Sequence, residues 1–160
     1  MNAPPFKPAT QRVIDACRRA GLNVDVVQHG ESTRTAEDAA RACGCAVGQI
    51  IKSLVFQRRD DETPVLLLVA GDNRVNEKAV AGVLGAALKR PDAAYVRSLT
   101  GYAIGGIPPL GHATPLATFM DEALLVHARV WAAAGTPDTV FAVDPAALRD
   151  AVGATVLRVA

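Results

Sequence analysis

Two apolar segments separated by a polar one limit the possible folds of this chain most strongly. Residues Ile50–Phe56 and Val65–Ala70 are rich in Val, Leu and Ile, and each has the length of a strand. The segment between them, Gln57–Pro64, is charged and ends in proline, which is typical of an exposed turn. The sequence therefore predicts a β-hairpin that is buried over most of its length.

Helix caps and glycine stops recur around this hairpin. Predicted helices span Thr10–Ala20, Thr35–Gly44, Asn76–Leu84, Asp92–Leu99 and Asp144–Gly153, and a short helical turn starts at Asp121-Glu122. Further strands are predicted at Asn23–Gln28, Leu116–Met120, Arg129–Ala133, Thr139–Val143 and Thr155–Val159. Hairpin-like neighbours outnumber strand–helix–strand units. The predicted fold is therefore α+β, a mixed, curved β-sheet flanked by helices.

The length of 160 residues predicts a single domain, residues 1–160, that is large enough to bury a substantial core. Its N-terminal residues 1–8 contain several prolines and are expected to be flexible. No apolar run approaches the ~20 residues that span a bilayer, and the N-terminus lacks an apolar signal core. We therefore expect a cytoplasmic protein with no membrane partner.

The formal charge of +1 is too low for the broad basic surface that binds long nucleic acids. No DNA partner is expected on this ground. Contact with the end of a single strand stays compatible with the charge.

A loop rich in glycine and proline, Gly101–His112, is apolar where surface loops are usually polar. Glycines let main-chain N–H groups approach a ligand closely. Pro108 and Pro109 stiffen the loop and have no N–H group, so the available donors are expected around Gly105, Gly106 and Ile107. The pattern favours a wall of a binding site, although a loop buried at a tight crossover would look similar.

Lys52 is the candidate side chain that the pattern singles out within the hairpin. Alternation places it on the same face as Ile50 and Leu54, and the other face of that strand is also mostly apolar. Lysine is rarely buried without a partner. Either its stem reaches an opening or its ammonium binds an anionic or carbonyl group of a ligand, and the pattern alone does not choose between these.

Three further polar residues are candidates for the site, and two of them allow two interpretations. Arg74 lies in a predicted strand–turn–helix junction. It either contacts a phosphate or is simply part of a capped turn. His112 is the last residue of the loop, and it is either an acid, a base or a donor to a ligand, or a packing residue. His29 lies in a polar connection on the side expected for Lys52.

Three cysteines do not suggest a disulfide framework or a metal site. Cys43 and Cys45 form a C-x-C pair, but Cys17 is remote and the histidines are scattered. We expect no metal and no cofactor. A thiol redox or metal protein that uses Cys43 and Cys45 is kept as a remote alternative.

These motifs together resemble the YbaK-like family, free-standing relatives of the editing insertion domain of bacterial prolyl-tRNA synthetase. The resemblance rests on Thr35–Phe56 with the strand that carries Lys52, on Gly71–Asn76, and on the loop Gly101–Gly111. It extends through Asp121-Glu122 and the C-terminal pattern, and so covers nearly the whole chain.

The resemblance implies hydrolysis of the ester bond of mischarged aminoacyl-tRNA, typically tRNA for proline that carries Ala, Cys, Ser or Thr. Lys52 is then the lysine that engages the substrate, and Gly105–Pro109 form the substrate loop. The expected catalytic groups are Lys52, Gly105, Gly106 and Ile107, and the expected substrate-binding residues are Pro108, Pro109, Gly111, His112, His29 and Arg74. The implied partners are the acceptor end of aminoacyl-tRNA and prolyl-tRNA synthetase.

Two departures leave the amino acid open. Cysteine-specific members often carry an aspartate near the position of Val140, to which Asp138 is close, and Pro108-Pro109-Leu110 replaces a more usual Ser-Pro-Ile or Ser-Pro-Leu. A non-catalytic module of the same fold, which binds a tRNA end or a synthetase, is the main alternative to the hydrolase.

Overall fold

The computed structural model describes residues 6–30 and 35–160. Residues 1–5 of the predicted flexible segment 1–8 lie outside these ranges, and the first helix begins at Pro8. The helices are α1 (Pro8–Arg19), α2 (Ala36–Cys43), α3 (Glu77–Leu84), α4 (Ala93–Thr100) and α5 (Pro145–Val152), with short 3-10 helices η1 (Val47–Gln49) and η2 (Glu122–Val126). The strands are β1 (Val26–Gln28), β2 (Ile51–Arg58), β3 (Pro64–Ala70), β4 (Leu88–Lys89), β5 (Ala117–Asp121), β6 (Val130–Ala133), β7 (Thr139–Val143) and β8 (Thr155–Leu157).

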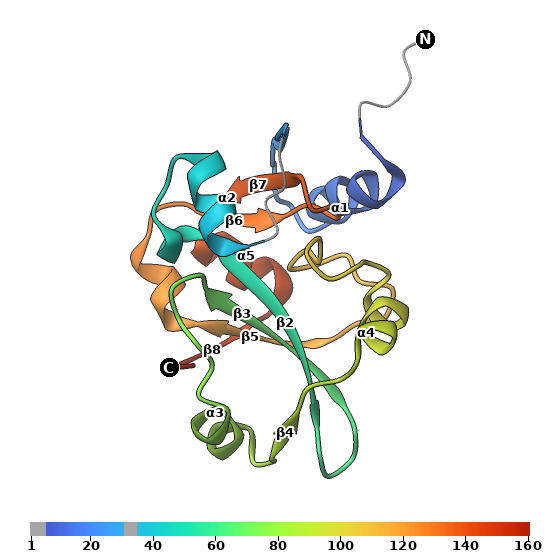
Figure 1. The fold of residues 1–160 in the computed structure, drawn as a ribbon, viewed down its shortest axis with the longest axis vertical. Helices are drawn as coiled ribbons and strands as arrows, with labels where there is room; N and C mark the ends of the chain where they lie inside the picture. The colour runs from blue at the N-terminus through green and yellow to red at the C-terminus, as the bar shows by residue number, and fades with distance from the viewer. Residues whose placement is uncertain (1–5, 31–34) are drawn as a thin grey trace.

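The strands form two sheets with helices around them (Figure 1). A five-stranded mixed sheet has the order β4-β2-β3-β5-β8, in which β2 runs antiparallel to β3 and β4, and β5 runs parallel to β3 and β8. A three-stranded antiparallel sheet has the order β1-β7-β6. An isolated bridge between Ile50 and Trp131 connects them. The α+β class is confirmed, but the strands divide between two sheets instead of one.

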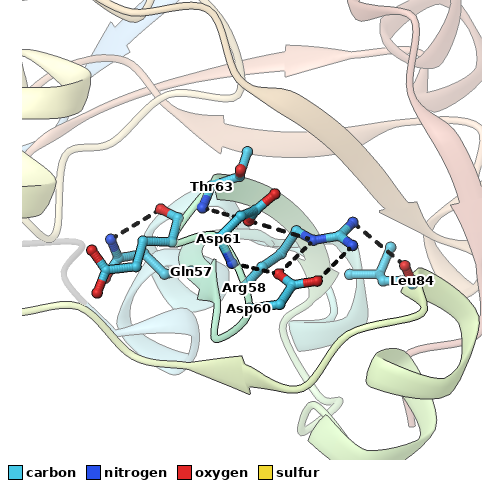
Figure 2. Close-up of polar contacts among 7 residues, drawn as sticks. Gln57, Arg58, Asp60, Asp61, Thr63 and Leu84 are labelled. Carbon is cyan, nitrogen blue, oxygen red and sulfur yellow. Dashed lines mark hydrogen bonds and ion pairs between the residues drawn. The ribbon is translucent and has the colours of Figure 1, made fainter.

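The predicted hairpin is confirmed as β2 and β3, and polar contacts hold its turn (Figure 2). The Arg58 guanidinium binds the Asp60 carboxylate at 3.3 Å and donates to the Leu84 carbonyl at 3.5 Å. The Thr63 N–H donates to the Asp61 carboxylate at 2.9 Å. These contacts support a register that pairs Lys52 with Val69. A shift of one residue would turn every side chain of β2 to the opposite face.

The predicted helix caps are also confirmed. At the N-termini of α2, α3, α4 and α5, the N-cap side chain accepts a hydrogen bond from a backbone N–H of the first turn. The N-cap residues are Thr35 of α2, Asn76 of α3, Asp92 of α4 and Asp144 of α5. Left-handed glycines end the same helices, at Gly44, Gly85, Gly101 and Gly153. The β-strand predictions are less accurate at the ends, because β1 begins only at Val26 and β8 stops at Leu157.

Both faces of the hairpin are buried. Ile51, Val55 and their β3 neighbours pack into the larger core with α1, α5, β6 and β7. Phe56, Leu67 and Val69 pack into a second cluster with Val80 of α3. No helix in the described part of the chain is both long and apolar enough to cross a membrane.

Candidate functional site

A cavity of about 480 Å³ lies along the outer edge of β2. On that side β2 pairs with β4 only at Gln57 and Arg58, so within the described ranges residues 51–56 have no strand partner there. Besides β2, six segments form the walls: the start of α2, the segment after β4, α4, the glycine-proline loop, β6 and β7. In this order they contribute Thr35, Ala36 and Ala39; Arg90 and Pro91; Val96; Ile104, Gly105 and Ile107; Trp131, Ala132 and Ala133; and Val140. Its size and mostly apolar walls are typical of a site for a small ligand.

Lys52 lines this cavity and is half-buried. Its Nζ donates a hydrogen bond to the main-chain carbonyl of Asn73, in the turn that follows β3. An ammonium carries three N–H groups. The turn therefore fixes the amine at the cavity through one donor, and a ligand can accept from the others.

The electrostatic surroundings of Lys52 are mixed. Burial is the main cause that lowers its pKa, and the nearby Arg74 acts in the same direction. The carboxylates of Glu37, Asp72 and Asp121 raise it. These carboxylates offset part of the cost that burial imposes on the ammonium, but the net effect is a pKa below the ordinary 10.5.

Asp121 braces the turn that holds Lys52. This carboxylate is 1 % exposed, and its Oδ2 accepts from the Ala70 N–H at 3.0 Å and from Asn73 Nδ2 at 2.9 Å. Its Oδ1 accepts from the Ala123 N–H at 3.0 Å, at the start of η2. A hydrogen-bonded path thus runs from the buried end of β5 through Asn73 to the lysine. This contribution is not evident from the sequence, in which Asp121 indicates only the start of a helical turn.

Two main-chain N–H groups of the glycine-proline loop make no hydrogen bond within the described ranges. They belong to Gly105 and Ile107, and both residues line the cavity. The N–H of Gly106 instead donates to the Ala103 carbonyl at 3.0 Å. The three predicted donors therefore reduce to two.

Gly106 has a packing function that explains why it is glycine. It is buried against the turn before β7, where a Cβ atom at this position would lie 2.9 Å from the main chain of Gly135. The Gly135 N–H donates to the Gly106 carbonyl at 2.9 Å. This close main-chain contact fixes Gly105 and Ile107 relative to the three-stranded sheet.

The remaining predicted residues of the loop lie behind the cavity wall. Pro108 and Pro109 are buried, and a Cβ atom on Gly111 would lie 2.9 Å from Ala16 of α1. In Figure 1 this segment lies beside α1. His112 Nε2 bonds the Pro108 carbonyl at 2.7 Å, and its ring meets Tyr102 edge to face. None of these four residues lines the cavity.

We expect His112 to stabilise the loop rather than to transfer protons. Burial lowers its pKa from the ordinary 6.5, so the folded protein favours the neutral ring. The unfolded chain then binds more protons below about pH 6.5, and stability falls as the pH drops through that window. In His112→Gln, the stability should fall less as the pH drops through this window. Urea unfolding at several pH values measures this difference. Any reaction at the cavity should keep its kcat/KM within about fivefold in this variant, whereas loss of a general acid or base costs about 100-fold or more.

His29 and Arg74 are not among the cavity-lining residues. The His29 N–H donates to the Asp138 carbonyl at 2.8 Å, and its Nε2 lies 3.9 Å from Cys43 Sγ. Residues 31–34, which follow it, lie outside the described ranges. Arg74 is exposed but lies close enough to influence the pKa of Lys52.

The cysteines lie in surroundings that disfavour thiolates. Burial raises the pKa of Cys17 to about 11, and burial together with Cys45 raises that of Cys43 to about 11. Over residues 6–30 and 35–160, no cluster of His, Cys, Asp or Glu could hold a metal ion.

Ser53, Arg90 and Trp131 line the cavity but were not predicted as site residues. Arg90 belongs to a pair of basic residues that resembles a solvated surface, and its guanidinium lies 5.3 Å from the centre of the Phe56 ring. Trp131 could have been noticed as the one tryptophan of the chain. Ser53 was not predicted because it lies among apolar residues in a strand that is expected to be buried.

Comparison with known proteins agrees with this architecture. The model of the aminoacyl-tRNA editing domain matches residues 30–151, and the chain belongs to this family. The uncharacterized protein YwhH of Bacillus subtilis is 29% identical over 126 residues, 79% of this chain and 80% of that protein. The proline–tRNA ligase of Desulforamulus reducens is 37% identical over 79 residues, which are 49% of this chain but 14% of the ligase. A crystal structure of a proposed trans-editing enzyme for prolyl-tRNA synthetase shares 42% identity, with a TM-score of 0.90 over 96% of this chain and 98% of that one.

Proposed function

We propose that this protein is a trans-editing deacylase that hydrolyses the ester bond of mischarged aminoacyl-tRNA, with tRNA for proline as the favoured carrier. The observation that carries the proposal is the shared cavity. It brings Lys52 together with Gly105 and Ile107, whose N–H groups make no hydrogen bond within the described ranges. The family membership and the similarity to a proline–tRNA ligase support this choice of substrate.

The arrangement suits ester hydrolysis without a side-chain nucleophile. Negative charge develops on the carbonyl oxygen as water attacks the acyl carbon, and fixed N–H donors in a partly dry site stabilise it. Gly105, Ile107 and Lys52 provide such donors. The bond from the acyl carbon to the ribose oxygen then breaks, and that oxygen takes up the proton that the water loses. The neighbouring ribose hydroxyl orients the water.

Selection between amino acids depends on the shape of the cavity. Ile107 is 8 % exposed, and Gly106 is wedged against Gly135, so the loop cannot retreat readily from a larger acyl group. Val140 places an apolar side chain in the wall. We propose that small acyl groups such as Ala, Cys, Ser or Thr enter, and that the prolyl ring is rejected sterically.

The test is release of the amino acid from tRNA for proline charged with Ala, Cys, Ser, Thr or Pro. We expect one or more of the four wrong aminoacyl groups to be released well above the spontaneous rate, and the prolyl ester to be spared. Binding of the charged tRNA without release of any of them would favour the non-catalytic module instead. A loss of deacylation in Cys43→Ser would support the thiol alternative, which the raised pKa of this thiol disfavours.

A further inference from the structure

Ser53 has a buried hydroxyl that the fold leaves without a partner. Its Oγ has less than 1 Å² of exposed surface, and of the buried side-chain nitrogen and oxygen atoms in the described ranges it is the one that lacks a hydrogen bond. Other buried polar side chains are paired. Thr10 and Thr139 contact each other at 3.3 Å, and Thr100 donates to the Val96 carbonyl at 2.8 Å.

An unpaired buried hydroxyl is unfavourable for the fold. Removing such a group from water without a new hydrogen bond costs free energy, whereas alanine at the same place would avoid this cost. The position lies within β2 and pairs with Leu68, so the sheet itself has no need of a polar group there. Residues that weaken the fold in this way are expected mainly at functional sites.

Ser53 belongs to the wall of the cavity, with its hydroxyl buried behind that wall. Ser53 lines the cavity and shares a face of β2 with Ile51 and Val55, opposite to the face that carries Lys52. Across that face lies the larger core, which includes Ile107. With Lys52 and the loop amides on the ester carbonyl, as proposed above, the part of the acyl group left to meet Ser53 is its side chain. A serine hydroxyl turns about a single χ1 bond between three staggered positions.

We propose that Ser53 determines specificity by hydrogen bonding to a hydroxyl on the acyl side chain, which makes a seryl ester a better substrate than an alanyl ester. This inference rests on the proposed deacylase function. Each hydroxyl can donate and accept, so one hydrogen bond between them gives each group a partner in a largely apolar cavity. A thiol is a weaker partner, so a cysteinyl ester gains less.

The experiment compares Ser53→Ala with wild type and with Ser98→Ala, a control at an exposed serine of α4. The kcat/KM for seryl- and alanyl-tRNA is measured separately. We expect Ser53→Ala to lower the seryl value about fivefold, the size expected for one neutral hydrogen bond, and to change the alanyl value less than about twofold. An equal fall for both esters, or no change for either, would overturn the proposal.

Two further readouts separate this inference from the proposed function. Amide analogues, seryl- and alanyl-aminoadenosine, report binding without hydrolysis. If wild type binds the seryl analogue more tightly than the alanyl one and Ser53→Ala removes this preference, the contact with Ser53 is supported. This holds even if wild type releases neither amino acid, a result that would reject only the proposed deacylase function.

Ser53→Ala should also melt at or above the temperature of wild type. Melting several degrees lower would show that the hydroxyl stabilises the fold, contrary to the inference.

Discussion

Lys52→Met should lower kcat/KM for deacylation about 100-fold or more, which is the range seen when a donor to a developing oxyanion is removed. Methionine keeps the apolar stem of the lysine within β2 but lacks the ammonium. Because burial lowers the pKa of Lys52, the folded protein does not favour its charged form, and we expect the variant to unfold at the same urea concentration as wild type or a higher one.

The matched control is Lys78→Met, at an exposed lysine of α3 outside the cavity wall. It removes the same charge from the chain and should deacylate like wild type. If Lys52→Met retained wild-type kcat/KM, Lys52 would have no function in the reaction. An equal loss in both variants would attribute the effect to net charge.

The pH dependence gives a second readout of the same lysine. Only the ammonium carries positive charge, and the neutral amine is a weaker donor, so the activity that depends on the ammonium falls as the pH rises through the pKa of Lys52. Burial lowers this pKa from the ordinary 10.5, and the alkaline fall should begin at a lower pH than for an exposed lysine. Spontaneous ester hydrolysis is subtracted at each pH. In Lys52→Met the residual rate should lack this fall.

Asp121→Ala should destabilise the protein by about 3 kcal/mol or more, because it removes the acceptor for three N–H donors in a buried place. The freed donors belong to Ala70, Asn73 and Ala123. Movement of the turn at Asn73 would also displace the Lys52 amine. Urea unfolding measures the first effect and kcat/KM the second.

Asp121→Asn tests the charge and the hydrogen bonds of this side chain without changing its size. Its NH₂ group cannot accept from the N–H donors, so we expect an intermediate loss of stability. Asp25→Asn, at an exposed position before β1, should change stability by less than about 0.5 kcal/mol. A change that small in Asp121→Ala would contradict the bracing function that we assign to this carboxylate.

The helix ends and the central hairpin could be predicted because the signals for them are local. Thr35 caps the helix that starts at the next residue, and Gly44 ends it in a left-handed conformation. The β2–β3 pair is joined by a short polar turn. Such interactions span only a few residues, so short sequence patterns contain them.

The division of the strands between two sheets could not be predicted in the same way. Pairing of β1 with β7 joins Val26 to Phe141, which lie far apart in the chain. The short strand β4 was missed because it pairs with β2 over only Gln57 and Arg58. Neither pairing leaves a local pattern.

Lys52 and the glycine-proline loop could be recognised from the residues, since a lysine in an apolar strand and an apolar loop rich in glycine are each unusual. The chemical groups that they contribute, an amine and main-chain N–H donors, follow from the residue types alone. Tertiary structure decided the rest: it closed the cavity along the edge of β2, used the Gly106 N–H within the loop, placed His112 behind the wall, and left the Ser53 hydroxyl unpaired beside the cavity. Each of these depends on contacts between distant segments, and packing and hydrogen-bond geometry are set only when those segments meet.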